Sequence, residues 1–217
     1  MKTILLSIAL CTLSFTTRAQ ASSDQYQQAM RQRLATMKTT SEKTPVAEML
    51  ALANQFERIA GAETGEWLPR YYAGLTYVYL GFMGKDQVEK DKFLDKADTY
   101  LAQADKLAPN NDELSVLRAY IAQARMSIDP MNRWQTYGGQ FDTAIEQAMA
   151  QNPNNPRPYV LKGTGLMYTP DQFGGGPKTA CLLLKTASEK FVTFKPASEI
   201  APNWGCGDLE QLLAKCK

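Results

Sequence analysis

Apolar residues recur along this chain at the spacing of amphipathic helices. A clear example ends at Pro109-Asn110-Asn111, and its apolar stripe consists of Phe93, Leu94, Ala97, Leu101, Ala104 and Leu107. No segment shows the alternation of apolar and polar residues that is typical of β-strands. The pattern predicts an all-α fold, with helices over residues 25–37, 45–60, 68–82, 91–107, 112–128, 140–151, 157–168, 178–194 and 208–215.

The helical pattern repeats about every 44 residues. Pro109-Asn110-Asn111 recurs 44 residues later as Pro153-Asn154-Asn155. Gly74, Ala119 and Gly163 are spaced 45 and 44 residues apart, each inside the first helix of a repeating unit. A small residue at a fixed place allows two helices to approach closely. The repeat therefore predicts antiparallel helix hairpins, followed by one closing helix.

The recurring residues resemble the tetratricopeptide repeat (TPR). The matching segments are Gly74-x2-Tyr77 with Ala97-x3-Leu101-x2-Ala104-x4-Pro109, and Gly163-x2-Leu166 with Ala180-x3-Leu184-x2-Ala187. The period departs from the usual TPR length of about 34 residues. The resemblance implies a short TPR-like α-solenoid of stacked helix hairpins, forming a single domain over residues 22–217.

A narrower resemblance concerns exported TPR-like proteins of Gram-negative bacteria, many of which have no assigned activity. The similar stretches are Arg133-Trp134, Tyr137-Gly138-Gly139, Asn155-Pro156-Arg157, Tyr168-Thr169-Pro170, Phe173-Gly174-Gly175-Gly176 and Pro202-Asn203-Trp204-Gly205. This resemblance implies an envelope location and a binding role. The Gly-Gly segments are also similar to the periplasmic TPR subunit of certain solute transporters, which implies a small-molecule ligand as the alternative.

Residues 1–21 have the features of a cleaved signal peptide. Met1-Lys2 gives a positive start, residues 4–15 form a short apolar run, and Ala19-Gln20-Ala21 matches a cleavage site. The apolar run is too short to span a bilayer, so no membrane insertion is expected. The predicted location is periplasmic or secreted.

Composition then restricts the chemistry. The chain has no histidine, which excludes histidine-dependent catalysis and histidine-ligated metals. Without Lys2 and Arg18 the formal net charge of +2 falls to zero, so a nucleic-acid partner is not expected. The carboxylate pairs Glu63/Glu66 and Asp95/Asp98 leave a carboxylate-dependent hydrolase as a third hypothesis, ranked below binding. We predict no catalytic residue, no metal and no cofactor.

The loops within the hairpins carry the candidate binding residues. Equivalent loops of a helical repeat line up along one edge, and aromatic residues and glycines give a ligand rigid contact area and close backbone approach. The candidates are Arg133, Trp134, Tyr137, Arg157, Phe173, Gly174, Gly175 and Lys178. The alternative is that the glycines serve turn geometry and that the arginines form internal salt bridges, for example to Asp129 or Asp171.

The three cysteines after residue 21 are Cys181, Cys206 and Cys216. A helix over residues 208–215 would hold Cys206 and Cys216 about 15 Å apart, beyond disulfide reach. A disulfide from Cys181 to either of them, or a buried unpaired Cys181, both remain open.

The sequence thus predicts a non-enzymatic periplasmic TPR-like interaction protein. Its expected partner is a protein or peptide of unknown identity, and a small-molecule ligand is the alternative. A groove lined by tyrosines would favour a peptide, and a pocket near Phe173 and Arg133 would favour a solute. The tyrosines in question are Tyr71, Tyr77, Tyr120 and Tyr159.

Overall fold

The computed structural model describes residues 23–41 and 43–216, and all regular structure within these ranges is helical. The expected signal peptide lies outside the described residues. A first helix covers residues 23–38, and the following elements are α2 (Val46–Ala62), α3 (Leu68–Met83), α4 (Gln87–Leu107), α5 (Asp112–Ile128), α6 (Pro130–Gln151), α7 (Arg157–Tyr168), the 3-10 helix η1 (Asp171–Phe173), α8 (Pro177–Thr193) and α9 (Cys206–Ala214). The all-α prediction is confirmed.

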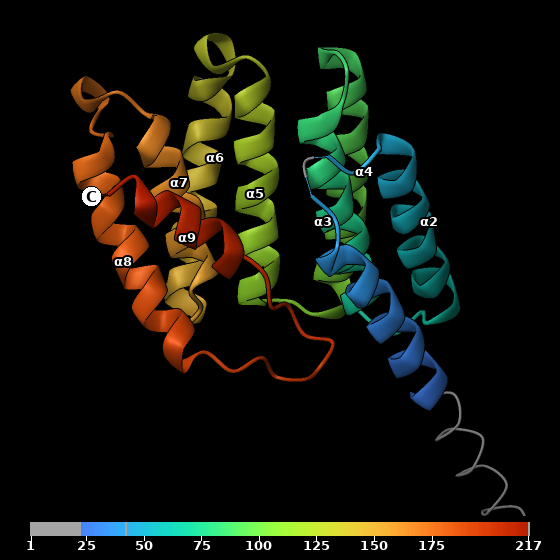
Figure 1. The fold of residues 1–217 in the computed structure, drawn as a ribbon. Coiled ribbons are helices and arrows are strands. Elements are labelled where there is room, and N and C mark those ends of the chain that lie inside the picture. Colours follow the sequence, from blue (N-terminus) through green and yellow to red (C-terminus); the bar gives the residue numbers. More distant parts are fainter. Residues whose placement is uncertain (1–22, 42, 217) are drawn as a thin grey trace, which may run out of the picture.

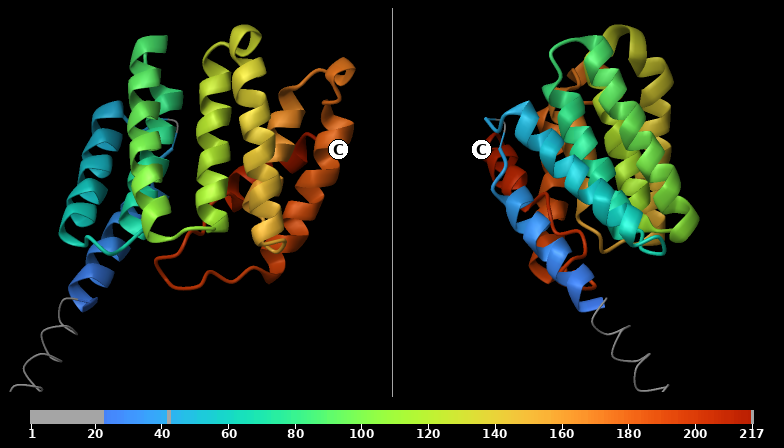
Figure 2. Two further views of the ribbon diagram at one scale, coloured as in Figure 1. Left: turned by 180° about the vertical axis from the view of Figure 1, so that it is seen from behind. Right: turned by 90° about the vertical axis from the view of Figure 1, so that its right-hand side faces the viewer.

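Helices that follow one another in the chain pack as antiparallel neighbours (Figure 1). The pairs α3/α4, α5/α6 and α7/α8 are such hairpins, and α2 packs on α3. Helix α3 also contacts α5, and α5 contacts α7, so the first helices of the hairpins adjoin one another. Residues 194–205, the first helix and α9 lie on one side of this row of helices (Figure 2).

The recurring small residues lie where helices approach closely, as predicted. A Cβ added to Gly74 would lie 3.1 Å from Leu117 Cδ2. A Cβ added to Gly163 would lie 2.7 Å from Leu184 Cδ2 and 3.4 Å from the Ala180 carbonyl oxygen. Ala119 is fully buried. The close spacing of α7 and α8 therefore depends on the absence of a side chain at residue 163.

The expected bounds of α6 were wrong. The sequence pattern predicts a loop at Arg133, Trp134 and Tyr137, before a helix that begins at residue 140, whereas α6 begins at Pro130. The side chain of Asp129 caps this helix by accepting from the Asn132 amide. Pro130 occupies the first turn, where its missing N–H costs nothing. These start signals outweigh the low helix propensity of Gly138 and Gly139, each about 1 kcal/mol less favourable than alanine.

The start of α4 was also predicted too late. It begins at Gln87 instead of residue 91, because the Asp86 side chain accepts from the Glu89 amide at 2.8 Å and caps the helix. The predicted bounds of α5 and α7 agree with the structure.

The C-terminal part is joined covalently to α8. Cys181 on α8 and Cys216 form a disulfide, and Cys206 is an exposed free thiol. The structure thereby decides between the two pairings that the sequence leaves open. Among the described residues, no helix combines the length and the apolar character that a membrane span requires.

Candidate functional site

Large exposed apolar side chains occur near the α5–α6 and α7–α8 turns. Both turns lie at the upper edge of the molecule in Figure 1. Trp134 is 56% exposed and Met131 84% exposed near the start of α6. Phe173 is 73% exposed in the α7–α8 turn, and Tyr168 is exposed at the end of α7. Two of these side chains, Trp134 and Phe173, are predicted binding residues, and both face solvent.

The glycines of the α7–α8 turn satisfy backbone requirements. Gly174 has φ 82° and Gly176 has φ 87°, a left-handed region that favours glycine. A Cβ on Gly175 would overlap the Thr169 carbonyl group. Lys178 is exposed in the first turn of α8. The turn geometry therefore accounts for all three glycines without a ligand.

Arg133 belongs to a partly exposed charged cluster on α4, α5 and α6. Its Nη1 and Nη2 donate to the two carboxylate oxygens of Asp91, both at 2.7 Å. Arg125 donates to Asp91, and to Asp95 and Asp98 at 2.7 and 2.6 Å. The Arg133 hydrogen bonds hold the pKa of Asp91 below its usual value, against the effect of partial burial. The internal salt bridge is formed, although with Asp91 and not with Asp129 or Asp171.

The charged cluster also contains Asp95 and Asp98, one of the two carboxylate pairs on which the hydrolase hypothesis rests. Both carboxylates of the Asp95/Asp98 pair accept from the single Arg125 guanidinium. The Tyr137 ring, a predicted binding residue, lies 6.0 Å from the same guanidinium. In the described parts of the chain, no group of three acidic or cysteine side chains could hold a metal ion.

Arg157 is the centre of a buried polar network. Its side chain is 0% exposed, and its Nη1 donates to Glu113 at 2.9 Å and to Asn155 at 3.1 Å. Its Nη2 donates to the Pro202 carbonyl oxygen. The guanidinium carbon lies 4.7 Å from the centre of the Phe194 ring. This predicted binding residue is therefore buried inside the molecule, and its acidic partner is Glu113, not Asp129 or Asp171.

Glu113 is the acidic member of this network. Burial raises the pKa of its carboxyl to about 7, against the opposing effect of the Arg157 charge. Neither Glu113 Oε2 nor Arg157 Nε has a hydrogen-bond partner among the described residues. The pair is thus held in a desolvated environment where both charges are sensitive to any change in their surroundings.

Four aromatic side chains form a connected surface cluster, here called the aromatic cluster: Tyr79, Phe82, Tyr120 and Trp204. The ring of Tyr120 lies 6.1 Å from Tyr79, 5.6 Å from Phe82 and 5.5 Å from Trp204, the last pair being stacked. Phe82 is 40% exposed, and the other three are partly exposed. The cluster therefore presents rigid aromatic surface from α3, α5 and the segment after α8.

The sequence pattern does not predict the aromatic cluster. Trp204 occurs in one of the stretches similar to exported TPR-like proteins, but no short-range pattern connects it with Phe82, which lies more than 100 positions earlier. A groove lined by all four tyrosines, which would favour a peptide partner, does not form, because Tyr71 and Tyr77 are buried. Of those four, only Tyr120 belongs to the aromatic cluster.

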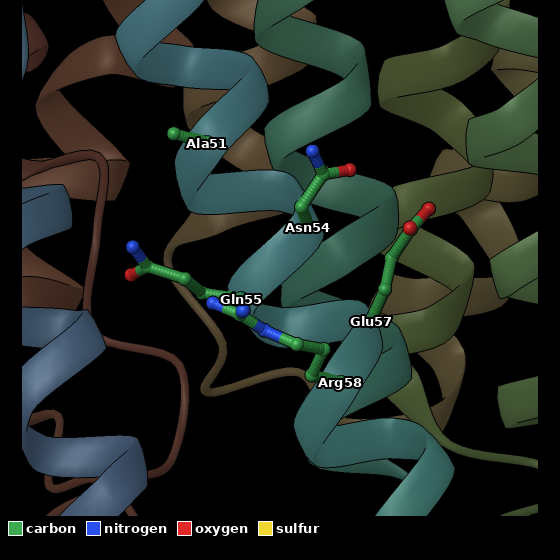
Figure 3. A pocket seen from close by; sticks show the side chains of 5 residues that line it. All are labelled: Ala51, Asn54, Gln55, Glu57 and Arg58. Carbon is green, nitrogen blue, oxygen red and sulfur yellow. The ribbon is translucent and has the colours of Figure 1, made fainter.

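A shallow open hollow lies on the outer face of α2. It is lined by Ala51, Asn54, Gln55, Glu57 and Arg58. Figure 3 shows that these side chains come from one helix and point in different directions. The hollow therefore lacks the converging groups of a ligand site.

Comparisons with known proteins add a similarity to a solved structure. No family model matches the chain. No curated protein matches it either. Among solved structures, the chain is similar to the HusA haemophore from Porphyromonas gingivalis, with 32% sequence identity and a TM-score of 0.78. The match covers 88% of this chain and 92% of the haemophore chain.

Proposed function

We propose that this chain, which belongs to the family of the HusA haemophore, is an exported, non-enzymatic binding protein whose ligand is haem or a similar flat tetrapyrrole. The proposal rests on the 32% sequence identity, over 88% of this chain and 92% of the haemophore chain. The ligand is cargo in this proposal, and the protein supplies only its binding surface. A small-molecule ligand, the alternative that the sequence offers, is thereby preferred to a protein or peptide partner.

The aromatic cluster is the proposed binding surface. Flat conjugated rings bind well against offset or edge-on aromatic side chains. The aromatic cluster offers this surface around Tyr120, with Phe82 at 40% exposure. Because the chain has no histidine, any protein ligand to the haem iron would be a side chain other than imidazole.

The finer features expected from the sequence remain proposals. A TPR-like solenoid is supported by the adjoining hairpins and by the close helix contacts at Gly74 and Gly163. A periplasmic or secreted location is supported by the signal-like residues 1–21 and by the family. The hairpin-end residues Trp134, Phe173 and Lys178 remain candidate contacts for a partner that delivers or receives the ligand.

Titration of the purified protein with haemin tests the proposal. The expected result is a saturable change in the Soret absorbance band with one haemin bound per chain. Tyr120→Ala is expected to weaken haemin binding, because it removes the central ring of the aromatic cluster. The matched control is Val192→Ala, which truncates an exposed side chain on α8. An unmodified protein that shows no saturable Soret change would contradict the proposal.

A protein or peptide partner is the second candidate. The exposed apolar side chains of Met131, Trp134 and Phe173 at the hairpin ends favour it, since such surface often marks a protein contact. Co-purification from the native cell envelope, followed by mass spectrometry, tests this function. Recovery of the protein without any bound chain would count against it.

A further inference from the structure

A strap of irregular chain, residues 194–205, closes one side of the aromatic cluster. It leaves the end of α8, runs across the ends of the neighbouring helices and returns to α9 (Figure 1). Its Ile200 side chain is buried in the same core cluster as α2 and α3. Trp204 is the strap's contribution to the aromatic cluster. The position of the strap therefore sets the position of one ring of the proposed binding surface.

Three buried or part-buried hydrogen bonds hold the strap against α3 and α7, and Arg31 of the first helix adds an exposed ion pair with Glu199 at 3.4 Å. The Tyr72 hydroxyl donates to the Ile200 carbonyl oxygen at 2.9 Å. The Trp204 indole N–H donates to the Tyr71 hydroxyl at 2.7 Å. Between these two anchors, Arg157 on α7 donates to the Pro202 carbonyl oxygen. The two tyrosines are both on α3, so Arg157 is the anchor that links the strap to α7.

Arg157 also contacts two aromatic rings of the strap. The guanidinium carbon lies 4.7 Å from the Phe194 ring and 5.7 Å from the Trp204 ring, distances typical of cation–π contact. Phe194 and Trp204 stand near the two ends of the strap. One side chain thus touches the beginning, the middle and the end of the same segment.

The chemistry of arginine explains why this position carries a buried charge. A guanidinium is planar and offers donors in a rigid fork, so it can serve several acceptors and stack on rings at once. Here the acceptors are Glu113, Asn155 and the Pro202 carbonyl oxygen. A buried ion pair is weak evidence for a stabilising role, and an apolar residue of similar volume could fill the same space. What an apolar residue could not supply is a directed bond to the strap.

We propose that Arg157 is a positioning residue for the ligand site, which acts by holding the strap so that Trp204 stacks on Tyr120. Arg157 itself is 0% exposed and does not touch the ligand. The inference rests on the proposed function, since it assigns the aromatic cluster as the ligand surface. It goes beyond that function by naming a residue outside the surface on which ligand affinity depends.

The first measurement follows the strap without any ligand. In a Trp67→Phe/Trp134→Phe background, Trp204 is the single remaining indole. Quenching of the Trp204 fluorescence by acrylamide then measures how far the indole of Trp204 is shielded from solvent. Arg157→Lys keeps a cation near Glu113 but loses the fork that reaches Pro202, and it is expected to increase quenching and shift Trp204 emission to longer wavelength. Arg157→Met is expected to produce a larger change in the same direction.

The second measurement is haemin titration of the same variants with the native tryptophans. Arg157→Lys is expected to weaken haemin binding by about tenfold, because a displaced Trp204 no longer offers its ring as a ligand contact beside Tyr120. The matched control is Arg70→Met. Arg70 is another buried arginine, and it donates to the carbonyl oxygens of Ala60, Glu63 and Glu66, away from the strap. Its loss is expected to lower the melting temperature while Trp204 quenching stays unchanged.

The outcomes separate this inference from the proposed function. If the unmodified protein binds no haemin, the proposed function fails, while the quenching measurement still decides whether Arg157 holds the strap. If Arg157→Lys is folded by circular dichroism and leaves both quenching and haemin affinity unchanged, the positioning role is overturned. It is also overturned if Arg70→Met changes Trp204 quenching as much as Arg157→Lys does, because the effect would then be general destabilisation.

Discussion

The hairpins α5–α6 and α7–α8 use the same residue types in opposite ways. Each carries an arginine near a helix start and a run of glycines. In α6, Arg133 pairs with Asp91 near the surface, and Gly138 and Gly139 are helical. In α7–α8, Arg157 is fully buried, and Gly174 and Gly176 have positive φ in the turn.

The difference shows that burial, and not residue type, decides the role of a charge. The charge of Arg133 remains partly hydrated, and its hydrogen bonds lower the pKa of Asp91. Arg157 opposes a desolvation effect so large that the pKa of Glu113 is still raised to about 7. The partly exposed ion pair of Arg133 therefore contributes little to the free energy of unfolding. The buried Arg157 requires all of its partners to stay in place, because losing one would leave a buried charge unpaired.

The largest expected effect comes from removing each arginine in turn. Arg157→Met removes one partner of the buried Glu113 pair together with the hydrogen bonds to Asn155 and Pro202, so we expect a loss of about 3–5 kcal/mol in the free energy of unfolding. Arg133→Met breaks a partly exposed pair, so we expect a loss below about 1 kcal/mol. Urea denaturation of both variants measures the two values. Equal losses in the two variants would contradict the conclusion that burial decides how much each arginine contributes to stability.

Next in size is the effect of bulk at the glycines. Gly163→Leu forces a side chain against Leu184 and the Ala180 carbonyl group, so we expect a loss of about 1–3 kcal/mol. Gly139→Leu is the matched control, because a Cβ at residue 139 meets nothing within 4 Å. Thermal denaturation compares them. An unchanged melting temperature for Gly163→Leu would refute the packing role of this position.

The carboxyl groups of Glu113 and Asp91 are expected to change the free energy of unfolding with pH in opposite directions. Folded Glu113 retains its proton up to about pH 7, above its usual pKa of 4.5, so its contribution to the free energy of unfolding decreases as pH rises through that window. The pKa of Asp91 is lowered from 3.8, so its contribution is present above that value and is lost as pH falls through its folded pKa.

Denaturation of Glu113→Gln and Asp91→Asn across this range measures both effects. The stability difference between the unmodified protein and Glu113→Gln should decrease with rising pH between 4.5 and about 7. The difference for Asp91→Asn should stay constant there and diminish only in more acidic solution. A flat difference for Glu113→Gln would mean that its carboxyl is not desolvated.

The smallest effect distinguishes helical glycine from turn glycine. Gly139→Ala should raise the free energy of unfolding by about 0.5–1 kcal/mol, because alanine is the better helix former at an exposed position. Gly176→Ala should lower it, because residue 176 has φ 87° and a Cβ there would overlap the Asp171 carboxylate. Melting temperatures check both signs. A higher melting temperature for both variants would contradict the distinction between a helical glycine at residue 139 and a turn glycine at residue 176.

Local spacing in the sequence predicted much of the fold. The helical periodicity predicted the all-α class and the bounds of α5 and α7. The recurring small residues predicted the close contacts at Gly74 and Gly163. The predicted start of α6 is wrong because two adjacent glycines are typical of a turn, whereas Asp129-Pro130 upstream is itself a helix-start signal. These features depend on residues near one another in the chain, which a periodic pattern can register.

The candidate site could not be predicted in the same way. The aromatic cluster joins α3, α5 and the strap, and the partners of Arg133 and Arg157 lie 42 and 44 residues away. The sequence therefore determined which segments are helical and which positions must be small, because hydrogen bonding and side-chain spacing within a helix are local. Only the tertiary structure decided which arginine is buried, which cysteine pairs with Cys181 and which rings meet, because these follow from the free energy of packing distant segments together.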